Sequence, residues 1–220
     1  MKTIFVTGID TGVGKTAAAG LLAKHLLEKG EKVITLKIVE TGAAGFSEDI
    51  KTHRNIMGIA LTEEDQKGLT CPYLFSLPAS PRLSANREGK SIDCNKILSS
   101  LHELQKNYST VILEGAGGLF VPLNERELIV DFIQKNRFPV VLVSSPRLGS
   151  INHTLLSLEA LKNRGIKIIG IVYNLAVEAD PLIVEDTRKT IQDFYPKLPI
   201  VDLPDYKKNP LQTINFSEII

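Results

Sequence analysis

The chain has 220 residues, of which 43% are hydrophobic and 23% are charged, and its formal net charge is +1. These values are typical of a globular enzyme, and the balanced charge excludes the clustered basic surface that binds nucleic acid. No apolar run reaches the roughly 20 residues of a membrane-spanning helix, the N-terminus lacks a signal-peptide pattern, and Cys71 and Cys94 have neither metal nor disulfide spacing. We therefore expect residues 1–220 to form one cytoplasmic domain with no nucleic-acid or membrane partner.

Short apolar segments rich in β-branched residues predict the strands. In chain order they are Thr3–Val6, Lys32–Ile38, Thr110–Leu113, Pro139–Ser144, Lys167–Tyr173 and Ile200–Leu203. Between them, helical spacing of apolar residues predicts helices over Leu21–Leu27, Ile97–Leu104, Ile151–Leu161 and Ile183–Phe194, with Gly30 and Gly165 at C-terminal caps. This alternation predicts a parallel sheet covered on both faces. The proline-rich segment Thr70–Gly89 is the longest irregular stretch and could border the active site.

The segment Val6–Thr16, with the sequence VTGIDTGVGKT, follows the first predicted strand and precedes the helical run Ala17–Leu27. In such a loop, successive backbone N–H groups surround phosphates, Lys15 reaches the β- and γ-phosphates, and the Thr16 hydroxyl ligates Mg²⁺. Position 9, where the general pattern has glycine, is isoleucine, so this loop is a variant that opens at Gly8. An ordinary turn with a chance Gly-Lys-Thr is the alternative, and the flanking strand and helix favour the phosphate loop.

Charged residues follow the second and third predicted strands, where ligands of a doubly wound sheet bind. Lys37 taken alone is more often a surface lysine, but a second cation near Lys15 would stabilise a transferring phosphoryl group. Glu114 precedes a glycine-rich turn, and a carboxylate facing a phosphate loop usually serves Mg²⁺. Asp49 either completes the metal ligands or caps the following helix. The sequence does not decide whether Glu48 or Asp49 faces the metal.

Three other features keep two interpretations each. The helix start Gly149–Asn152 offers free N–H groups to a substrate carboxylate, or is an ordinary helix start. His153 is either a packed helix residue or a ligand. Ser80 and Pro81 shape either a substrate pocket or a turn.

Several segments together resemble the dethiobiotin synthetase family, and the resemblance extends from the first strand to at least Asn174. The segments EGAGG and LGSINH are far more specific than the phosphate loop, which many ATPases share, and the region of Pro204 resembles the adenine-side loop of that family more weakly. The resemblance implies an α/β fold of three layers, similar to P-loop NTPases, with a mostly parallel central sheet flanked by helices. The matching segments are Gly8–Thr16, Lys37 with Thr41-Gly42, Ser80-Pro81 with Glu88-Gly89, Glu114–Gly118 with Val121-Pro122, and Leu148–His153.

The family resemblance implies an ATP-dependent ring closure. Such an enzyme forms dethiobiotin from 7,8-diaminononanoate, CO₂ and MgATP, through a carbamate that ATP phosphorylates, and releases ADP and phosphate. It implies that Lys37 and Lys15 are catalytic. It also implies that Thr16, Asp49 and Glu114 hold Mg²⁺. No side-chain nucleophile is required, because positioning and charge stabilisation suffice.

The same resemblance implies the binding residues and a homodimer. Asn174 would bind adenine and Thr41 the diamine end, while a second subunit would supply the helix start that holds the substrate carboxylate. The implied ATP-binding residues are Gly12, Val13, Gly14, Lys15, Thr16, Ala17, Asp49, Glu114, Gly115, Ala116, Gly117, Asn174 and Pro204. The implied substrate-binding residues are Thr11, Thr41, Gly118, Leu148, Gly149, Ser150, Ile151 and Asn152.

Two departures and one rival remain. The family commonly has proline after the catalytic lysine and a small or neutral residue two positions later, where this chain has Ile38 and Glu40. Glu40 could turn outward or could tune Lys37. A ParA/MinD-like ATPase switch acting on a protein partner is the alternative function, but such proteins usually have a lysine at the position of Asp10, and the C-terminal segment Asn215–Ile220 is neither basic nor long enough for a membrane anchor.

Overall fold

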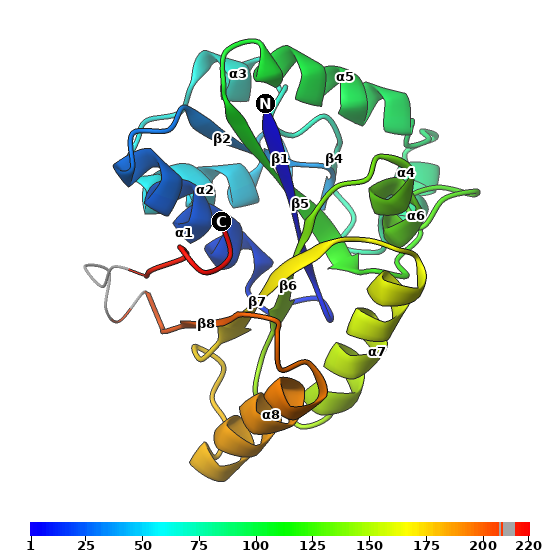
Figure 1. Cartoon of the computed structure of the whole chain (residues 1–220). Helices are drawn as coiled ribbons and strands as arrows, with labels where there is room; N and C mark the ends of the chain where they lie inside the picture. Colours follow the sequence, from blue (N-terminus) through cyan, green and yellow to red (C-terminus); the bar gives the residue numbers. More distant parts are fainter. Residues whose placement is uncertain (207, 209–213) are drawn as a thin grey trace.

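The computed structural model describes residues 1–206, 208 and 214–220 (Figure 1). Within these residues, six strands form a central sheet in the order β2-β5-β1-β6-β7-β8, and every pair of neighbours is parallel. The strands are β1 (Lys2–Gly8), β2 (Val33–Lys37), β5 (Thr110–Gly118), β6 (Val140–Ser144), β7 (Ile168–Asn174) and β8 (Ile200–Leu203). The predicted parallel α/β fold is confirmed, and each predicted strand is present.

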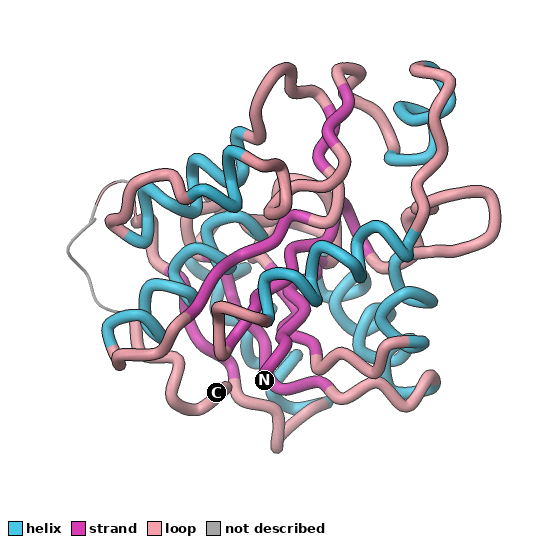
Figure 2. The backbone as a smooth tube through the Cα atoms, turned by 90° about the horizontal axis from the view of Figure 1, so that it is seen from above, coloured by secondary structure: helices cyan, strands magenta, loops and turns pink. Residues whose placement is uncertain are grey.

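Helices cover both faces of this sheet (Figures 1 and 2). One face packs against α1 and α2, and the other packs against α5, α6 and α7, with α8 beside α7. The helices are α1 (Lys15–Glu28), α2 (Glu48–Met57), α3 (Glu63–Gln66), α4 (Pro81–Arg87), α5 (Cys94–Gln105), α6 (Ile129–Lys135), α7 (Ser150–Asn163) and α8 (Pro181–Phe194). Gly30 and Gly165 each follow the C-cap residue of a helix, α1 and α7 respectively.

The segment Thr70–Gly89, expected to be irregular, contains two ordered elements. Its strand β4 (Leu74–Phe75) pairs in parallel with β3 (Glu40–Thr41), which follows β2 closely. Its helix α4 begins at Pro81, where the fixed φ of proline suits the first helical position. Both elements are short, so their sequences have too few residues to show a strand or helix periodicity.

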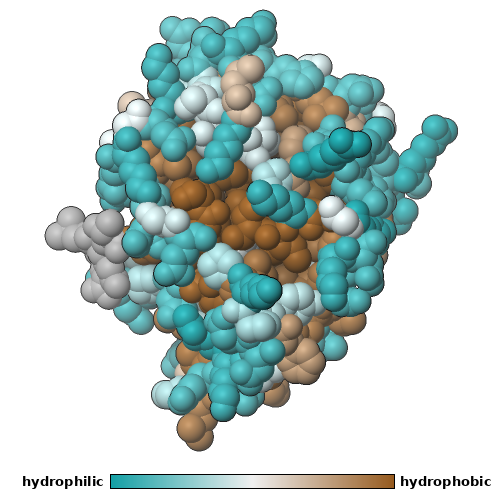
Figure 3. Space-filling view, in the orientation of Figure 1, coloured by the Kyte–Doolittle hydropathy of each residue, from teal (hydrophilic) through white to brown (hydrophobic). Residues whose placement is uncertain are grey.

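The core lies on both sides of the sheet, because alternate side chains of a strand point to opposite faces. In β1, Ile4 and Val6 pack with α1, whereas Phe5 packs with Phe132 of α6 and with Phe138; all but Phe138 are completely buried. On the face drawn in Figure 3, apolar residues gather at the centre and hydrophilic residues surround them. Among the described residues, no helix has both the length and the apolar character needed to cross a membrane.

A buried ion pair joins Arg54 of α2 to Asp65 of α3, and Arg54 also bonds to the sheet. The guanidinium of Arg54, 1% exposed, donates to both carboxylate oxygens of Asp65, over 2.9 and 2.8 Å, and to the hydroxyl of Thr35 in β2 over 2.8 Å. Asp65 also accepts from the Thr70 hydroxyl at 2.7 Å. Burial raises the pKa of Asp65, but these hydrogen bonds and the charge of Arg54 outweigh burial and lower it. The helix that begins with Glu48 and Asp49 is therefore held at its other end.

Candidate active site

The loop between β1 and α1 forms a cradle at the carboxyl end of the sheet. Gly14 caps α1 with φ of 99°, a left-handed conformation that suits glycine, and a Cβ there would lie 2.4 Å from Nδ2 of Asn174. The Lys15 ammonium donates to the carbonyl of Asp10 at 2.8 Å. The first turn of α1 has no acidic residue, so its free N–H groups favour an anion at this end.

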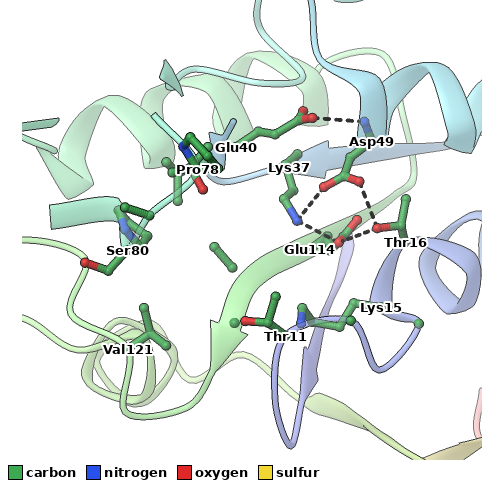
Figure 4. A pocket seen from close by; sticks show the side chains of 18 residues that line it. Thr11, Lys15, Thr16, Lys37, Glu40, Asp49, Pro78, Ser80, Glu114 and Val121 are labelled. Atoms are coloured by element: carbon green, nitrogen blue, oxygen red, sulfur yellow. Dashed lines mark hydrogen bonds and ion pairs between the residues drawn. The ribbon is translucent and has the colours of Figure 1, made fainter. Parts of the chain in front are cut away.

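Four side chains converge beside this loop (Figure 4). Lys37 ends β2 and is paired in register with Glu114 of β5, while Asp49 comes from the first turn of α2. The Lys37 Nζ lies 2.7 Å from Oε1 of Glu114 and 2.7 Å from Oδ2 of Asp49. The Thr16 hydroxyl donates to Asp49 over 2.9 Å and to Glu114 over 3.0 Å, as alternative or shared bonds. The sheet and two helices thus place one cation and three oxygen-bearing groups together.

Burial and charge act against each other in this cluster. Burial lowers the pKa of Lys37, but the carboxylates of Glu114 and Asp49 outweigh it and raise that pKa above its usual value. Burial likewise raises the pKa of Glu114, but Lys37 and His53 outweigh it and hold that pKa below its usual value. The Lys37 ammonium and the Glu114 carboxylate therefore both stay charged near neutral pH.

His53 is a member of the cluster that the sequence analysis missed. It is completely buried in α2, and its Nε2 lies 2.8 Å from Oε2 of Glu114. Its position four residues after Asp49 puts both side chains on one face of the helix, which is the signal that could have found it. Asp49 points into the cluster, whereas the carboxylate of Glu48 accepts from Lys51 at 2.6 Å.

These residues open onto a cleft of about 700 Å³. Pro78, Ser80 and Val121 lie on the side of the cleft away from Thr16 and Asp49 (Figure 4). The sequence-predicted residues that line it are Thr11, Gly12, Gly14, Lys15, Thr16, Lys37, Thr41, Asp49, Glu114, Ala116 and Gly117. The predicted residues outside its lining are Val13, Ala17, Gly115, Gly118, Asn174, Pro204 and the segment Leu148–Asn152.

Several of the residues outside the lining bond to Lys37 or to the phosphate loop. The carbonyl of Gly115 accepts from Lys37 at 3.0 Å, and Gly118 pairs with Gly8 at the start of the phosphate loop. Asn174 donates from Nδ2 to the carbonyl of Val13 at 2.9 Å. Pro204 follows Leu203, the pairing partner of Asn174, so these two predicted adenine-side residues lie at neighbouring strand ends.

The predicted carboxylate-binding segment at the start of α7 lies apart from the cleft. Leu148, Gly149 and Ile151 line a smaller cavity of about 310 Å³, which residues of α8 close on its other side. Leu148 is 89% exposed. Arg147, whose guanidinium forms an ion pair with Asp10, joins this region to the phosphate loop. Among the described residues of one chain, therefore, the start of α7 and the lysine-carboxylate cluster do not share a cavity.

Comparisons with known proteins show the family of this chain. A family model described as an AAA domain matches residues 2–205. An ATP-dependent dethiobiotin synthetase of Haemophilus influenzae is 51% identical, over 84% of this chain and 96% of its own length. One from Chlorobaculum tepidum is 50% identical over 92% of this chain and 87% of its own, and one from Pasteurella multocida is 47% identical over 89% and 92%. The chain belongs to the dethiobiotin synthetase family.

Solved structures with a similar fold include a ParA family ATPase and a cell division complex. A ParA family ATPase from Chlorobium tepidum aligns with a TM-score of 0.57 over 100% of this chain and 98% of its own, at 15% identity. The MinC:MinD cell division complex of Aquifex aeolicus aligns with a TM-score of 0.56 over 93% of this chain and 82% of the other, at 18% identity. At these identities the likeness extends to the fold alone, whereas the dethiobiotin synthetases match this chain in sequence over most of its length.

Proposed function

We propose that residues 1–220 act as one ATP-dependent synthetase domain, which makes dethiobiotin from 7,8-diaminononanoate, CO₂ and ATP. The observation that carries the proposal is the ion-paired cluster of Lys37, Asp49 and Glu114 beside the phosphate loop, in a chain about half identical to dethiobiotin synthetases. The ParA/MinD-like switch has support only from the fold.

ATP binds, in this proposal, with its phosphates on the loop from Gly12 to Ala17. The free N–H groups at the start of α1 and the Lys15 ammonium face the phosphates, as the open helix end and the 6% exposure of Lys15 support. Asn174 and Pro204 lie on the adenine side. Position 117 requires glycine, since the φ of Gly117 is 70° and a Cβ there would lie 2.7 Å from Cγ2 of Val121.

Mg²⁺ fits between Thr16, Asp49 and Glu114. One carboxylate oxygen of Asp49 lies 2.9 Å from the Thr16 hydroxyl, and one of Glu114 lies 3.0 Å from it. Mg²⁺ prefers oxygen ligands. The two carboxylates alone make a small donor set, so the hydroxyl and the phosphates of ATP complete it. Bound there, Mg²⁺ would neutralise charge on the phosphates during transfer.

The reaction needs three steps, and this chain contributes charge and position. One amine of the diamine attacks CO₂ and loses a proton, which gives a carbamate. A carbamate oxygen attacks the γ-phosphorus and ADP leaves, while Lys37 and Lys15 stabilise the negative charge on the transferring group. The second amine then attacks the carbonyl carbon, the ureido ring closes and phosphate leaves. Thr11 and Thr41, which line the cleft, bind the diamine.

A homodimer completes the site in this proposal. The segment Leu148–Asn152 is expected to bind the substrate carboxylate, yet in one chain it lies outside the cleft. A second copy can supply the N–H groups of its α7 start where the first cannot. The high exposure of Leu148 supports an interface at this point.

The test is phosphate release from MgATP by the purified chain, with and without 7,8-diaminononanoate and bicarbonate. We expect release that depends on the diamine, with one dethiobiotin, identified by mass spectrometry, for each phosphate. Hydrolysis that proceeds at the same rate without diamine and yields no dethiobiotin would favour the nucleotide switch instead.

Binding of ATP is expected to take up a proton at alkaline pH. Burial and the neighbouring Lys37 lower the pKa of Lys15 to about 8, so this amine is charged below pH 8 and neutral above it. Phosphates favour the charged form, and affinity should therefore fall by about tenfold per pH unit well above pH 8. Calorimetry with a non-hydrolysable ATP analogue and Mg²⁺, in buffers of different ionisation enthalpy, measures the uptake at pH 7 and pH 9.5.

The control for this prediction is Lys15→Arg, because a guanidinium stays charged across this range. Proton uptake at pH 9.5 should approach one per ATP in the unaltered chain and disappear in the variant. Equal uptake at both pH values in the unaltered chain would contradict the assignment to Lys15.

A further inference from the structure

The carboxylate of Glu40 occupies the N-terminus of α2. Glu40 follows β2 by three residues, and only 8% of it is exposed. Its side chain accepts hydrogen bonds from the Ser47 hydroxyl and from the backbone N–H of Glu48, the latter over 3.1 Å. It also accepts from the backbone N–H of Asp49 over 3.4 Å (Figure 4). Glu40 is therefore not turned outward: its carboxylate bonds to the start of α2, and it also interacts electrostatically with Lys37.

These bonds satisfy groups that helix geometry leaves without partners. The first N–H groups of a helix have no acceptor within it, and the positive end of the helix dipole favours a carboxylate there. Ser47 supplies the ordinary cap, since its hydroxyl accepts from the N–H of Ile50 at 3.0 Å. Glu40 adds a second, non-local cap that covers two further N–H groups and comes from the sheet side of the cleft.

The same turn of α2 delivers Asp49 to the cluster. One of the N–H groups that donate to Glu40 belongs to Asp49. The carboxylate of Asp49 lies 2.7 Å from Lys37 and 2.9 Å from the Thr16 hydroxyl. The far end of α2 is already fixed by Arg54. Glu40 thus adds to the Ser47 cap in holding the N-terminal end of α2, and Glu40 and its neighbour Thr41 both line the cleft.

We infer that Glu40 is a positioning residue, which sets the place of the Asp49 carboxylate for binding of Mg²⁺ with ATP. The inference rests on the proposed Mg²⁺ site at Thr16, Asp49 and Glu114. We assign the positioning of Asp49 to the hydrogen bonds that the Glu40 oxygens accept from two N–H groups, and not to the charge of Glu40. Partners that orient metal ligands typically contribute about 10- to 100-fold in metal affinity or activity.

Two substitutions separate the effect of the length of the Glu40 side chain from the effect of its charge. Glu40→Asp keeps the charge but withdraws the carboxylate by one methylene, whereas Glu40→Gln removes the charge but keeps an acceptor oxygen at the same distance. Mg²⁺ binding to each chain saturated with a non-hydrolysable ATP analogue is measured by calorimetry, without diamine. We expect Glu40→Asp and Glu40→Ala to weaken Mg²⁺ binding by about 10-fold or more, and Glu40→Gln to weaken it less than either.

Asp180→Ala is the matched control, because it removes a helix cap, the bond to the N–H of Leu182 at the start of α8, away from the cleft. It should lower the melting temperature and leave Mg²⁺ binding unchanged. If Glu40→Ala behaves in the same way, or if Glu40→Asp binds Mg²⁺ better than Glu40→Gln, the inference is overturned. Should Glu40→Ala fail to fold, the order of the other two variants decides.

The proposed function is tested separately from this inference. Dethiobiotin formation by the unaltered chain tests the synthetase, and Mg²⁺ binding without diamine tests Glu40. A chain that makes no dethiobiotin but shows the expected order of Mg²⁺ affinities retains the role of Glu40. An unaltered chain that binds the ATP analogue but no Mg²⁺ overturns the role of Glu40 whatever its activity.

Discussion

Replacing Lys37 by glutamine is expected to lower the turnover of dethiobiotin formation by about 10²- to 10³-fold, the usual loss for one preorganised electrostatic group. The ammonium lies 2.7 Å from two carboxylates, and its raised pKa keeps it charged throughout the neutral range. Glutamine keeps a similar size but supplies no charge to the phosphorylated carbamate. The measurement is kcat for phosphate release and for dethiobiotin formation at saturating diamine, bicarbonate and MgATP.

The control for Lys37→Gln is Lys51→Gln, which removes an exposed lysine on α2 that pairs with Glu48 outside the cluster. This variant should keep the activity of the unaltered chain. Circular dichroism of both variants separates lost chemistry from lost structure, because Lys37→Gln leaves the buried carboxylate of Glu114 without its ion-pair partner. A folded Lys37→Gln variant with a kcat within about threefold of the unaltered chain would remove Lys37 from the catalytic groups.

Replacing Arg54 by methionine is expected to lower the free energy of unfolding by about 3–5 kcal/mol, the usual cost of leaving one member of a buried ion pair alone. Arg54 is 1% exposed and its partner Asp65 is 3% exposed, so water cannot replace the lost bonds. For a chain of this size, the melting temperature should fall by roughly 10 °C. Urea unfolding and differential scanning calorimetry measure both quantities.

The control for Arg54→Met is Lys24→Ala, which removes a partly exposed ion pair with Glu28 on α1 and should barely change the melting temperature. A double variant, Arg54→Met with Asp65→Asn, should be more stable than the sum of the single losses predicts, because no unpaired charge is left. An Arg54→Met chain as stable as the unaltered one would show that this ion pair does not hold α2 in place.

The fold was largely predictable because its signals are local. Each strand of the central sheet is an apolar run, and each long helix among those predicted repeats its apolar residues at helical spacing. The phosphate loop was predictable for the same reason, since its glycines, Lys15 and Thr16 are consecutive or nearly so. Short elements were not predicted, because α6 and the strands β3 and β4 have too few residues to show a periodicity.

Most of the residues that form the site were predictable, but their arrangement was predictable only in part. Lys37, Asp49 and Glu114 were singled out because they follow strands or begin a helix, and the structure brings both carboxylates within ion-pair distance of Lys37. The contact of His53 with Glu114, 61 positions away, was not predictable, although the spacing of four residues between Asp49 and His53 places both on one face of the helix. The proline-rich segment Thr70–Gly89 was singled out as a stretch that could border the active site, and its residues Pro78, Ser80 and Pro81 line the cleft.

The sequence by itself determined which strands and helices follow one another along the chain, the phosphate loop, and the chemical types of the groups at the strand ends. Only the tertiary structure decided that Lys37 lies opposite Glu114, that Asp49 rather than Glu48 enters the cluster, and that Glu40 caps α2. Periodicity assigns a side chain to one face of its own element, whereas contact across 77 positions between Lys37 and Glu114 depends on sheet order and register. Those depend on packing of the whole core, which no short segment contains.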